Sequence, residues 1–217
     1  MHAKGQHREE RNPRSWMRAT DDEIREKYLE RAIREINSLS HEIQDCELCP
    51  RGNLMPVLGS GHPQADVMLL KYAPRPSEIE EGVAFYGRSG SALMKSFSRL
   101  GIDPLVVYGT LFVKCPVPDT DMSAGECRAR VADEMAIVQP RIVVVMGELA
   151  LAELNALSLP LARPVEAKLG EVQKLTPSVD ALYVPDIDSA LDEDSAKREF
   201  WAGFRVLGDW YAELPPY

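Results

Sequence analysis

The sequence IVVVM at residues 142–146, followed at once by Gly147, is the stretch that decides the fold. A short run that is apolar at every position is typical of a strand buried on both faces, because a strand with one wet face alternates apolar and polar residues. Two similar runs, ADVMLL at 65–70 and VVYGTLFV at 106–113, predict two more buried strands. Residues 181–184 predict a weaker fourth strand.

Helical patterns separate these apolar runs. Residues 21–43 carry apolar side chains three or four positions apart, and Thr20 with Glu23 forms a capping box in front of them. Further helices are predicted over four ranges: 91–100, 123–138, 148–157 and 192–213. Strands that alternate with helices predict a three-layer α/β/α fold around a central parallel sheet of about four strands, whose working surface lies beyond the strand carboxyl ends.

Length and composition favour one soluble domain. The chain has 217 residues, of which 45% are hydrophobic and 27% charged, and these values are typical of a globular protein. It contains no run of eighteen apolar residues, and its N-terminal residues lack the apolar core of a signal peptide. We therefore expect a cytoplasmic protein that does not contact a membrane.

The charge is uneven along the chain. Lys and Arg number 25 against 34 acidic residues, so the net charge of −9 opposes nonspecific binding to nucleic acid unless basic residues gather on one face. The first nineteen residues nevertheless hold five basic residues: Lys4, Arg8, Arg11, Arg14 and Arg18. We expect residues 1–19 to form a flexible basic arm, with or without a partner, attached to one domain over residues 20–217.

The four cysteines occupy special places in the pattern. Cys46 and Cys49 form a Cys-x-x-Cys after the first helix, Cys115 follows the second strand, and Cys127 falls in the first turn of a helix. Disulfides are not expected in a chain without an export signal, and a helix N-terminus favours the thiolate that a metal needs. The pattern predicts a four-thiolate site, for which zinc and an iron–sulfur cluster are both suitable.

The cysteines and the motifs between them resemble family 4 uracil-DNA glycosylases. The resemblance covers roughly residues 43–205 and implies that the four cysteines ligate a [4Fe–4S] cluster. It rests on the order and spacing of six pieces: Cys46-x-x-Cys49; ADVM at 65–68 leading to Ala73-Pro74; Phe85-x-Gly87-Arg88-x-Gly90; Val113-Lys114-Cys115 with Cys127; Pro140-x-Ile142-Val143-Val144-x-x-Gly147; and Lys197-Arg198 before Trp201.

The same resemblance implies roles for pocket residues, and it shows positions at which this sequence differs from the family motifs. Phe85 stands where the family's base-stacking phenylalanine stands. The family's Gly-Glu-Ala-Pro-Gly is replaced by KYAPR at 71–75, and its amide-reading asparagine is replaced by Leu111. Its late histidine position is taken by Val184 or Asp186, depending on the alignment. An enzyme that flips a base and stabilises the leaving ring needs these polar groups, and each lost donor costs ~2.7–4 kcal/mol.

These departures predict a uracil-DNA glycosylase-like iron–sulfur protein that is deficient in uracil excision. We expect it to act as a DNA-associated or partner-binding module. One alternative is an active glycosylase that removes uracil or another damaged base in DNA repair, with Tyr72 and Asp186 as its catalytic groups. Another alternative is a structural protein that meets no nucleic acid.

Basic residues near the strand ends predict a nucleic-acid-binding cleft. Its expected residues are Lys71, Arg75, Gly87, Arg88 and Lys114, with Phe85 as a stacking platform for single-stranded or damaged DNA. Separate solvated charges are the alternative. The acidic residues between Asp186 and Asp194 are expected to be the solvated start of a helix.

Overall fold

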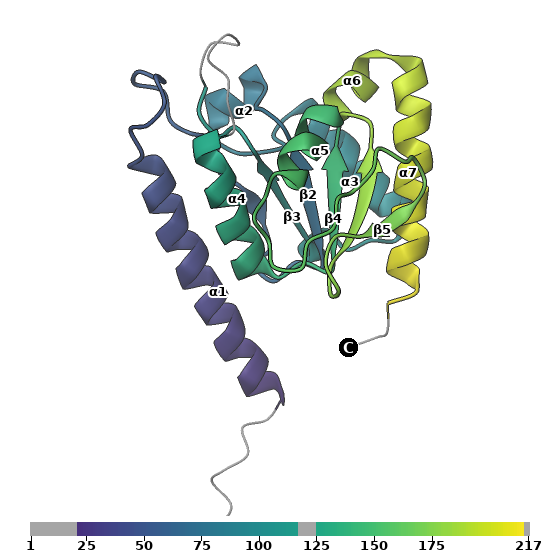
Figure 1. Cartoon of the computed structure of the whole chain (residues 1–217), viewed down its shortest axis with the longest axis horizontal. Helices are drawn as coiled ribbons and strands as arrows, with labels where there is room; N and C mark the ends of the chain where they lie inside the picture. Colours follow the sequence, from purple (N-terminus) through teal and green to yellow (C-terminus); the bar gives the residue numbers. More distant parts are fainter. Residues whose placement is uncertain (1–20, 117–124, 215–217) are drawn as a thin grey trace, which may run out of the picture.

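The computed structural model describes residues 21–116 and 125–214. Its centre is a six-stranded mixed sheet in the order β1-β3-β2-β4-β6-β5 (Figure 1). The predicted basic arm at residues 1–19, the cap at Thr20 and the start of the predicted helix at 123 lie outside the described residues.

The four expected parallel strands are all present, and they form the middle of the sheet. They are β2 (Val67–Lys71), β3 (Val107–Leu111), β4 (Ile142–Met146) and β6 (Asp180–Val184). Every residue of β2, β3 and β4 is buried. This burial on both faces explains why the sequence of these strands is mostly apolar and does not alternate with polar residues. Their carboxyl ends bring Lys71, Leu111 and Met146 to one edge of the sheet in matched register.

The two edge strands were missed by the sequence pattern. β1 (Ser60–Gly61) and β5 (Val172–Lys174) pair antiparallel with β3 and β6. Both are short and largely polar, so neither produces the apolar run by which a central strand is recognised.

The described helices are α1 (Asp21–Gln44), α2 (Pro76–Glu81), α3 (Arg88–Leu100), α4 (Gly125–Val138), α5 (Glu148–Asn155), α6 (Ile187–Asp192) and α7 (Asp194–Ala212), with a short 3-10 helix, η1 (Pro104–Val106). The short helices α2 and α6 were not predicted, because one turn and a half is too brief to show a helical period. The five longer helices fall where the spacing of apolar residues predicts them, to within a few residues at each end.

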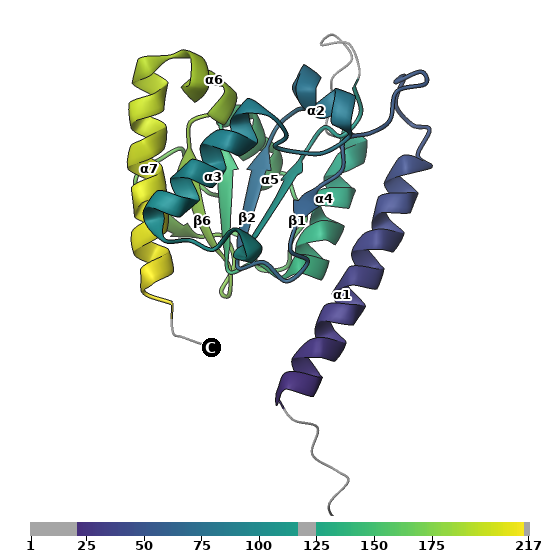
Figure 2. The ribbon, with the colours of Figure 1, turned by 180° about the vertical axis from the view of Figure 1, so that it is seen from behind.

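Helices cover both faces of the sheet, which confirms the three layers. One core cluster packs α3, α6 and α7 on the sheet through side chains such as Phe97, Ile187 and Phe204. The other packs α4 and α5 on the opposite face through side chains such as Val131 and Leu154. The two opposite views agree on this division (Figures 1 and 2).

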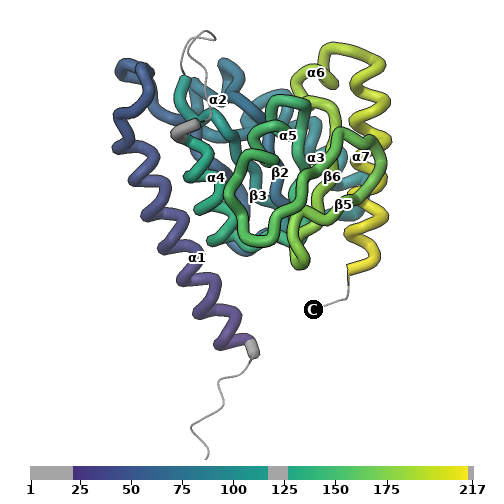
Figure 3. The backbone as a smooth tube through the Cα atoms, in the orientation of Figure 1, coloured from purple at the N-terminus to yellow at the C-terminus, as the bar shows by residue number. Residues whose placement is uncertain are grey.

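Helix α1 stands apart from these layers. It lies beside α4 at one side of the molecule, while α7 lies at the other side (Figure 3). Its buried apolar side chains are Ala32, Leu39 and Ile43, and the last of these comes just before Cys46. Of the described helices, none is both long enough and apolar enough to cross a membrane.

Candidate metal centre and base-binding site

Three of the four predicted cysteine ligands come together in space. The Sγ atoms of Cys49, Cys115 and Cys127 all lie within 4.8 Å of one another. Cys46 lines the same cavity of about 170 Å³, together with apolar side chains that include Ile43. The segment after α1, the turn after β3 and the first turn of α4 therefore meet at one thiol-rich site, as the spacing predicts.

The surroundings of Cys127 favour its thiolate. A hydrogen bond from the Cys115 thiol, aided by the backbone N–H and the charge of Lys114, lowers the pKa of Cys127 to about 6. The pKa of Cys115 is raised, because its thiol donates that bond and is buried. One ready thiolate beside three further thiols, in an apolar cavity, is a donor set that fits a thiolate-ligated metal or cluster.

A buried ionic network lies at the end of β2. Lys71 is 0% exposed, and its Nζ lies 2.7 Å from Glu78 Oε2 and 2.9 Å from Asp188 Oδ2. The exposed Arg75 adds its Nε at 3.1 Å from Asp188 Oδ2. Burying an ammonium is costly unless it is paired, so these contacts hold the Lys71 side chain inside the protein.

The ring of Phe85 belongs to the same buried region. The Phe85 backbone has a φ of 59°, and its N–H donates to Glu78 Oε1. The side chain is 9% exposed, and Lys71 Nζ lies 5.5 Å from the ring centroid. The ring also packs against the backbone of Gly109, where a Cβ atom would come within 2.5 Å of Phe85 Cδ2. Phe85 is therefore held between β3 and the ionic network.

Lys114 forms a second buried network on the α4 side of the sheet. Its Nζ donates to Thr110 Oγ1 at 2.6 Å and to Glu134 Oε2 at 2.8 Å. The Tyr108 hydroxyl donates to the same carboxylate at 3.1 Å. Lys114 is 0% exposed, so its charge is satisfied inside the protein.

The expected basic cleft is therefore not assembled as the sequence suggested. Lys71 and Lys114 are buried against carboxylates in two separate networks, and only Arg75 and Arg88 of the expected cations are exposed. Arg88 pairs with Asp192 at 3.1 Å on the surface. Gly87, with a φ of 82°, caps the start of α3 and lies close to Ser77.

Tyr72 and Asp186 are both half-buried; Tyr72 directly follows β2, and Asp186 lies two residues after the end of β6. The Asp186 carboxylate accepts the backbone N–H of Ser189 at 3.0 Å and so caps α6. Burial and the nearby charge of Glu153 raise the pKa of Tyr72, so its phenol remains protonated at neutral pH. Tyr72 is thus a hydrogen-bond donor, and Asp186 is already engaged in a helix cap.

Comparison with known proteins decides the family. The pattern of the uracil DNA glycosylase superfamily matches residues 58–204. The chain is 32% identical over 147 residues to the type-4 uracil-DNA glycosylase of Pyrobaculum aerophilum, covering 64% of this chain and 72% of that protein. This chain belongs to the uracil-DNA glycosylase superfamily. It is also 22% identical over 192 residues to the type-4 enzyme of Archaeoglobus fulgidus, covering 83% of this chain and 96% of the relative.

Within this uracil-DNA glycosylase superfamily fold, sequence reasoning missed three carboxylates. Glu78 and Asp188 bind Lys71, and Glu134 binds Lys114. Asp188 was expected in a solvated acidic stretch, and this prediction was wrong because the side chain turns inward to neutralise Lys71. No local pattern marks these residues, and the only sequence signal was that two lysines lie at the ends of buried strands.

Proposed function

We propose that this chain is a uracil-DNA glycosylase-like iron–sulfur protein that binds DNA and is deficient in uracil excision. The proposal has three parts: a cluster held by four cysteines, association with DNA, and a base site closed by the protein's own side chains. The burial of Lys71 beside Phe85 is the observation that carries the last part.

The cluster is supported by the donor set. The resemblance to family 4 implies a [4Fe–4S] cluster, and Cys46, Cys49, Cys115 and Cys127 would hold it. Such a cluster would brace the segment after α1 against the start of α4. Zinc remains the alternative, because three Sγ atoms within 4.8 Å of one another also suit a single tetrahedral ion.

The loss of excision is supported by the contents of the base site. Where the family motif opens with glycine, Lys71 instead fills the space beside the Phe85 ring with a buried, doubly paired ammonium. Leu111, at the position of the family's asparagine, is fully buried and offers no hydrogen bond. A flipped base would have to break the ionic network to stack on Phe85, and it would then find no amide to read its edge.

One observation favours the alternative of an active enzyme. The protonated phenol of Tyr72 could donate a hydrogen bond to a carbonyl of a bound base, while Asp186 would need to leave its helix cap to take part. A glycosylase built on these two residues would act on uracil or on another damaged base.

The deciding experiment is a lesion panel. Pure protein is incubated with single and double strands that contain uracil, hypoxanthine or xanthine, and abasic sites are then cleaved with alkali. We expect no scission above background for any lesion, while the same preparation contains iron and retains single-stranded DNA. Robust scission that is lost in Tyr72→Phe and Asp186→Asn would overturn the proposal in favour of the active enzyme.

A further inference from the structure

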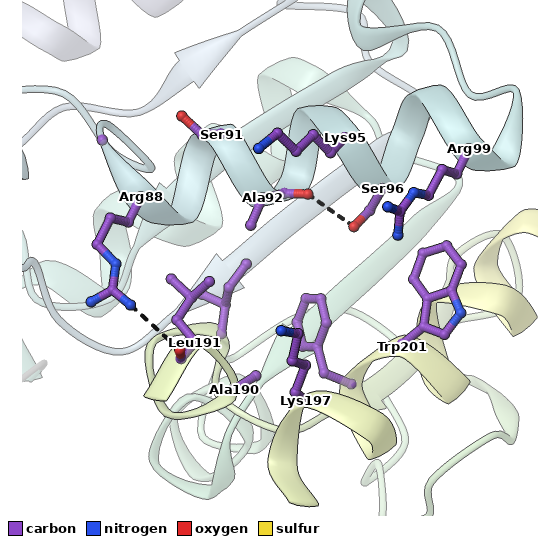
Figure 4. Close-up of a pocket in the computed structure, with 13 residues that line it drawn as sticks. Arg88, Ser91, Ala92, Lys95, Ser96, Arg99, Ala190, Leu191, Lys197 and Trp201 are labelled. Atoms are coloured by element: carbon purple, nitrogen blue, oxygen red, sulfur yellow. Dashed lines mark hydrogen bonds between the residues drawn. The ribbon is translucent and has the colours of Figure 1, made fainter. Parts of the chain in front are cut away.

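A groove lies between α3 and α7, on the side of the molecule away from α1 (Figure 4). Its volume is about 610 Å³, and it begins at Gly87 and Arg88, directly after the Phe85 loop. The apolar floor includes Ile187 and Phe200, and Arg99 of α3 points toward Trp201 of α7. We call this feature the α3–α7 groove.

The α3–α7 groove is basic in an acidic protein. Arg88, Lys95 and Arg99 line it from α3, and Lys197 lines it from α7. No acidic side chain is among the described residues that line it, although Asp192 at its rim pairs with Arg88. In a chain of net charge −9, four cations along one groove favour an anionic ligand.

The spacing of the cations indicates a ligand with several separated charges. Arg88 and Arg99 are eleven positions apart on α3, which at 1.5 Å per residue corresponds to about 16 Å. Lys95 lies between them, and Lys197 stands on the opposite wall. A single phosphate would engage only part of this array, whereas a chain of phosphates can follow it.

The aromatic residues supply a second kind of contact. Trp201 is half-buried, and the Arg99 guanidinium lies 5.8 Å from its ring centroid. If Arg99 turns to a phosphate of the ligand, the ring face that it now covers is open to a planar base, and such stacking tolerates any base sequence. Cations in a row beside an aromatic ring favour single-stranded nucleic acid over an acidic peptide.

We propose that the α3–α7 groove binds a single-stranded segment of nucleic acid, with its phosphates along Lys95, Arg99 and Lys197 and a base against Trp201. The strand then passes over Arg88 toward the Phe85 loop. This inference rests on the proposed function, since it gives the DNA association a defined surface distinct from the base site.

The test is fluorescence anisotropy with labelled oligothymidylate of two lengths, a tetranucleotide and an octanucleotide, over a series of salt concentrations. The groove variant is Lys95→Glu with Lys197→Glu. The matched control is Lys27→Glu with Arg34→Glu, which makes the same change of charge on exposed positions of α1. Trp201→Ala tests stacking, and circular dichroism checks that each variant is folded.

We expect the groove variant to bind at least ~tenfold more weakly near 0.1 M salt. The slope of the logarithm of the binding constant against the logarithm of the salt concentration should become shallower by about 1.4, because each of the two lost phosphate contacts on a single strand contributes about 0.7. Trp201→Ala should lose about tenfold in affinity with an unchanged slope. The α1 control should bind nearly as the parent protein does.

If the groove variant and the α1 control bind the oligothymidylates equally well, the groove is not the binding site, although the protein still associates with DNA. Tight binding of thymidine monophosphate with no gain from a longer strand would also overturn it. If the parent protein retains no single strand at low salt, the DNA-binding part of the proposed function fails together with the groove.

Discussion

Lys71 Nζ lies 2.9 Å from Asp188 Oδ2, and these two residues are 117 positions apart in the chain. The contact joins the end of β2 to α6 and places a buried positive charge beside the Phe85 ring. A lysine in the position of a family glycine thereby becomes part of the protein's own core. The candidate base site and the stability of the fold are linked through this one side chain.

Replacing Lys71 should destabilise the protein strongly. In Lys71→Met the carboxylate of Glu78 stays buried without its cation, and breaking such a pair costs about 3–5 kcal/mol. Urea denaturation would measure the lower free energy of unfolding. The matched control, Lys95→Met on the exposed face of α3, should change it by less than about 0.5 kcal/mol. A Lys71→Met protein as stable as this control would contradict the buried network.

Enlarging Gly109 should disturb Phe85. In Gly109→Ala the new methyl group would lie 2.5 Å from Phe85 Cδ2, and the ring is too confined to move freely, so we expect a loss of about 1–3 kcal/mol. Thermal unfolding would measure it, and Phe85→Leu in the same chain should recover part of the loss.

The control for this prediction is Gly208→Ala in α7. There the added Cβ would lie 2.9 Å from Leu100 Cδ2, at the end of a flexible side chain, and 3.3 Å from Leu100 Cβ, while alanine favours a helix over glycine by about 1 kcal/mol. We expect a smaller loss of stability than in Gly109→Ala. Equal effects at the two glycines would show that Phe85 does not pack on β3 as described.

Removing the proposed metal group should loosen one side of the molecule. Without a cluster, the segment that carries Cys46 and Cys49 loses its tie to Cys115 and Cys127, because site formation is coupled to folding. Hydrogen exchange should accelerate in residues 45–56 and at the start of α4, while β2 and β4 remain protected.

Metal analysis identifies the group itself. We expect brown protein with about four irons per chain. Cys46→Ser should lose the iron, whereas the exposed neighbour Glu47→Ala should keep it. Colourless protein with one zinc per chain would refute the cluster.

The stability should fall in alkali because of Tyr108. Burial and the adjacent Glu134 carboxylate raise the pKa of this phenol far above its usual value of about 10. Above about pH 10 the unfolded chain loses the proton and the folded protein keeps it, so the free energy of unfolding decreases by up to about 1.4 kcal/mol per pH unit. Urea denaturation at a series of alkaline pH values would show this slope.

Two variants test the assignment. Tyr108→Phe removes the titrating group, so its stability should depend less steeply on pH in this range than that of the parent protein. Tyr28→Phe, at an exposed position of α1, should leave the slope unchanged. The same slope in all three proteins would mean that Tyr108 does not titrate as described.

Much of the fold could be predicted because its signals are local. IVVVM at 142–146 and the two similar runs are buried on both faces, so the apolar composition of each run is enough to predict a strand. The edge strand β5 and the short helix α6 could not be found in this way. Both are too short to show a period of their own: β5 has three residues and is defined by its pairing with β6, and α6 has six residues and packs on the core beside α3 and α7.

In the candidate site, too, the features marked by local sequence spacing could be predicted and those that depend on burial could not. The Cys-x-x-Cys spacing and the helix start at Cys127 were enough to predict a shared thiol site. The lysines were read as an exposed basic cleft, because sequence shows their charge and not their burial.

The sequence by itself determined the four parallel strands at the centre of an α/β fold, a shared cysteine site and a divergent superfamily pattern, since apolar runs and motif spacings are properties of neighbouring residues. Only the tertiary structure decided that Lys71 turns inward to Glu78 and Asp188, and that α3 and α7 enclose a basic groove. A buried charge depends on the whole set of groups that folding gathers around it, and residues far apart in the chain supplied that set here.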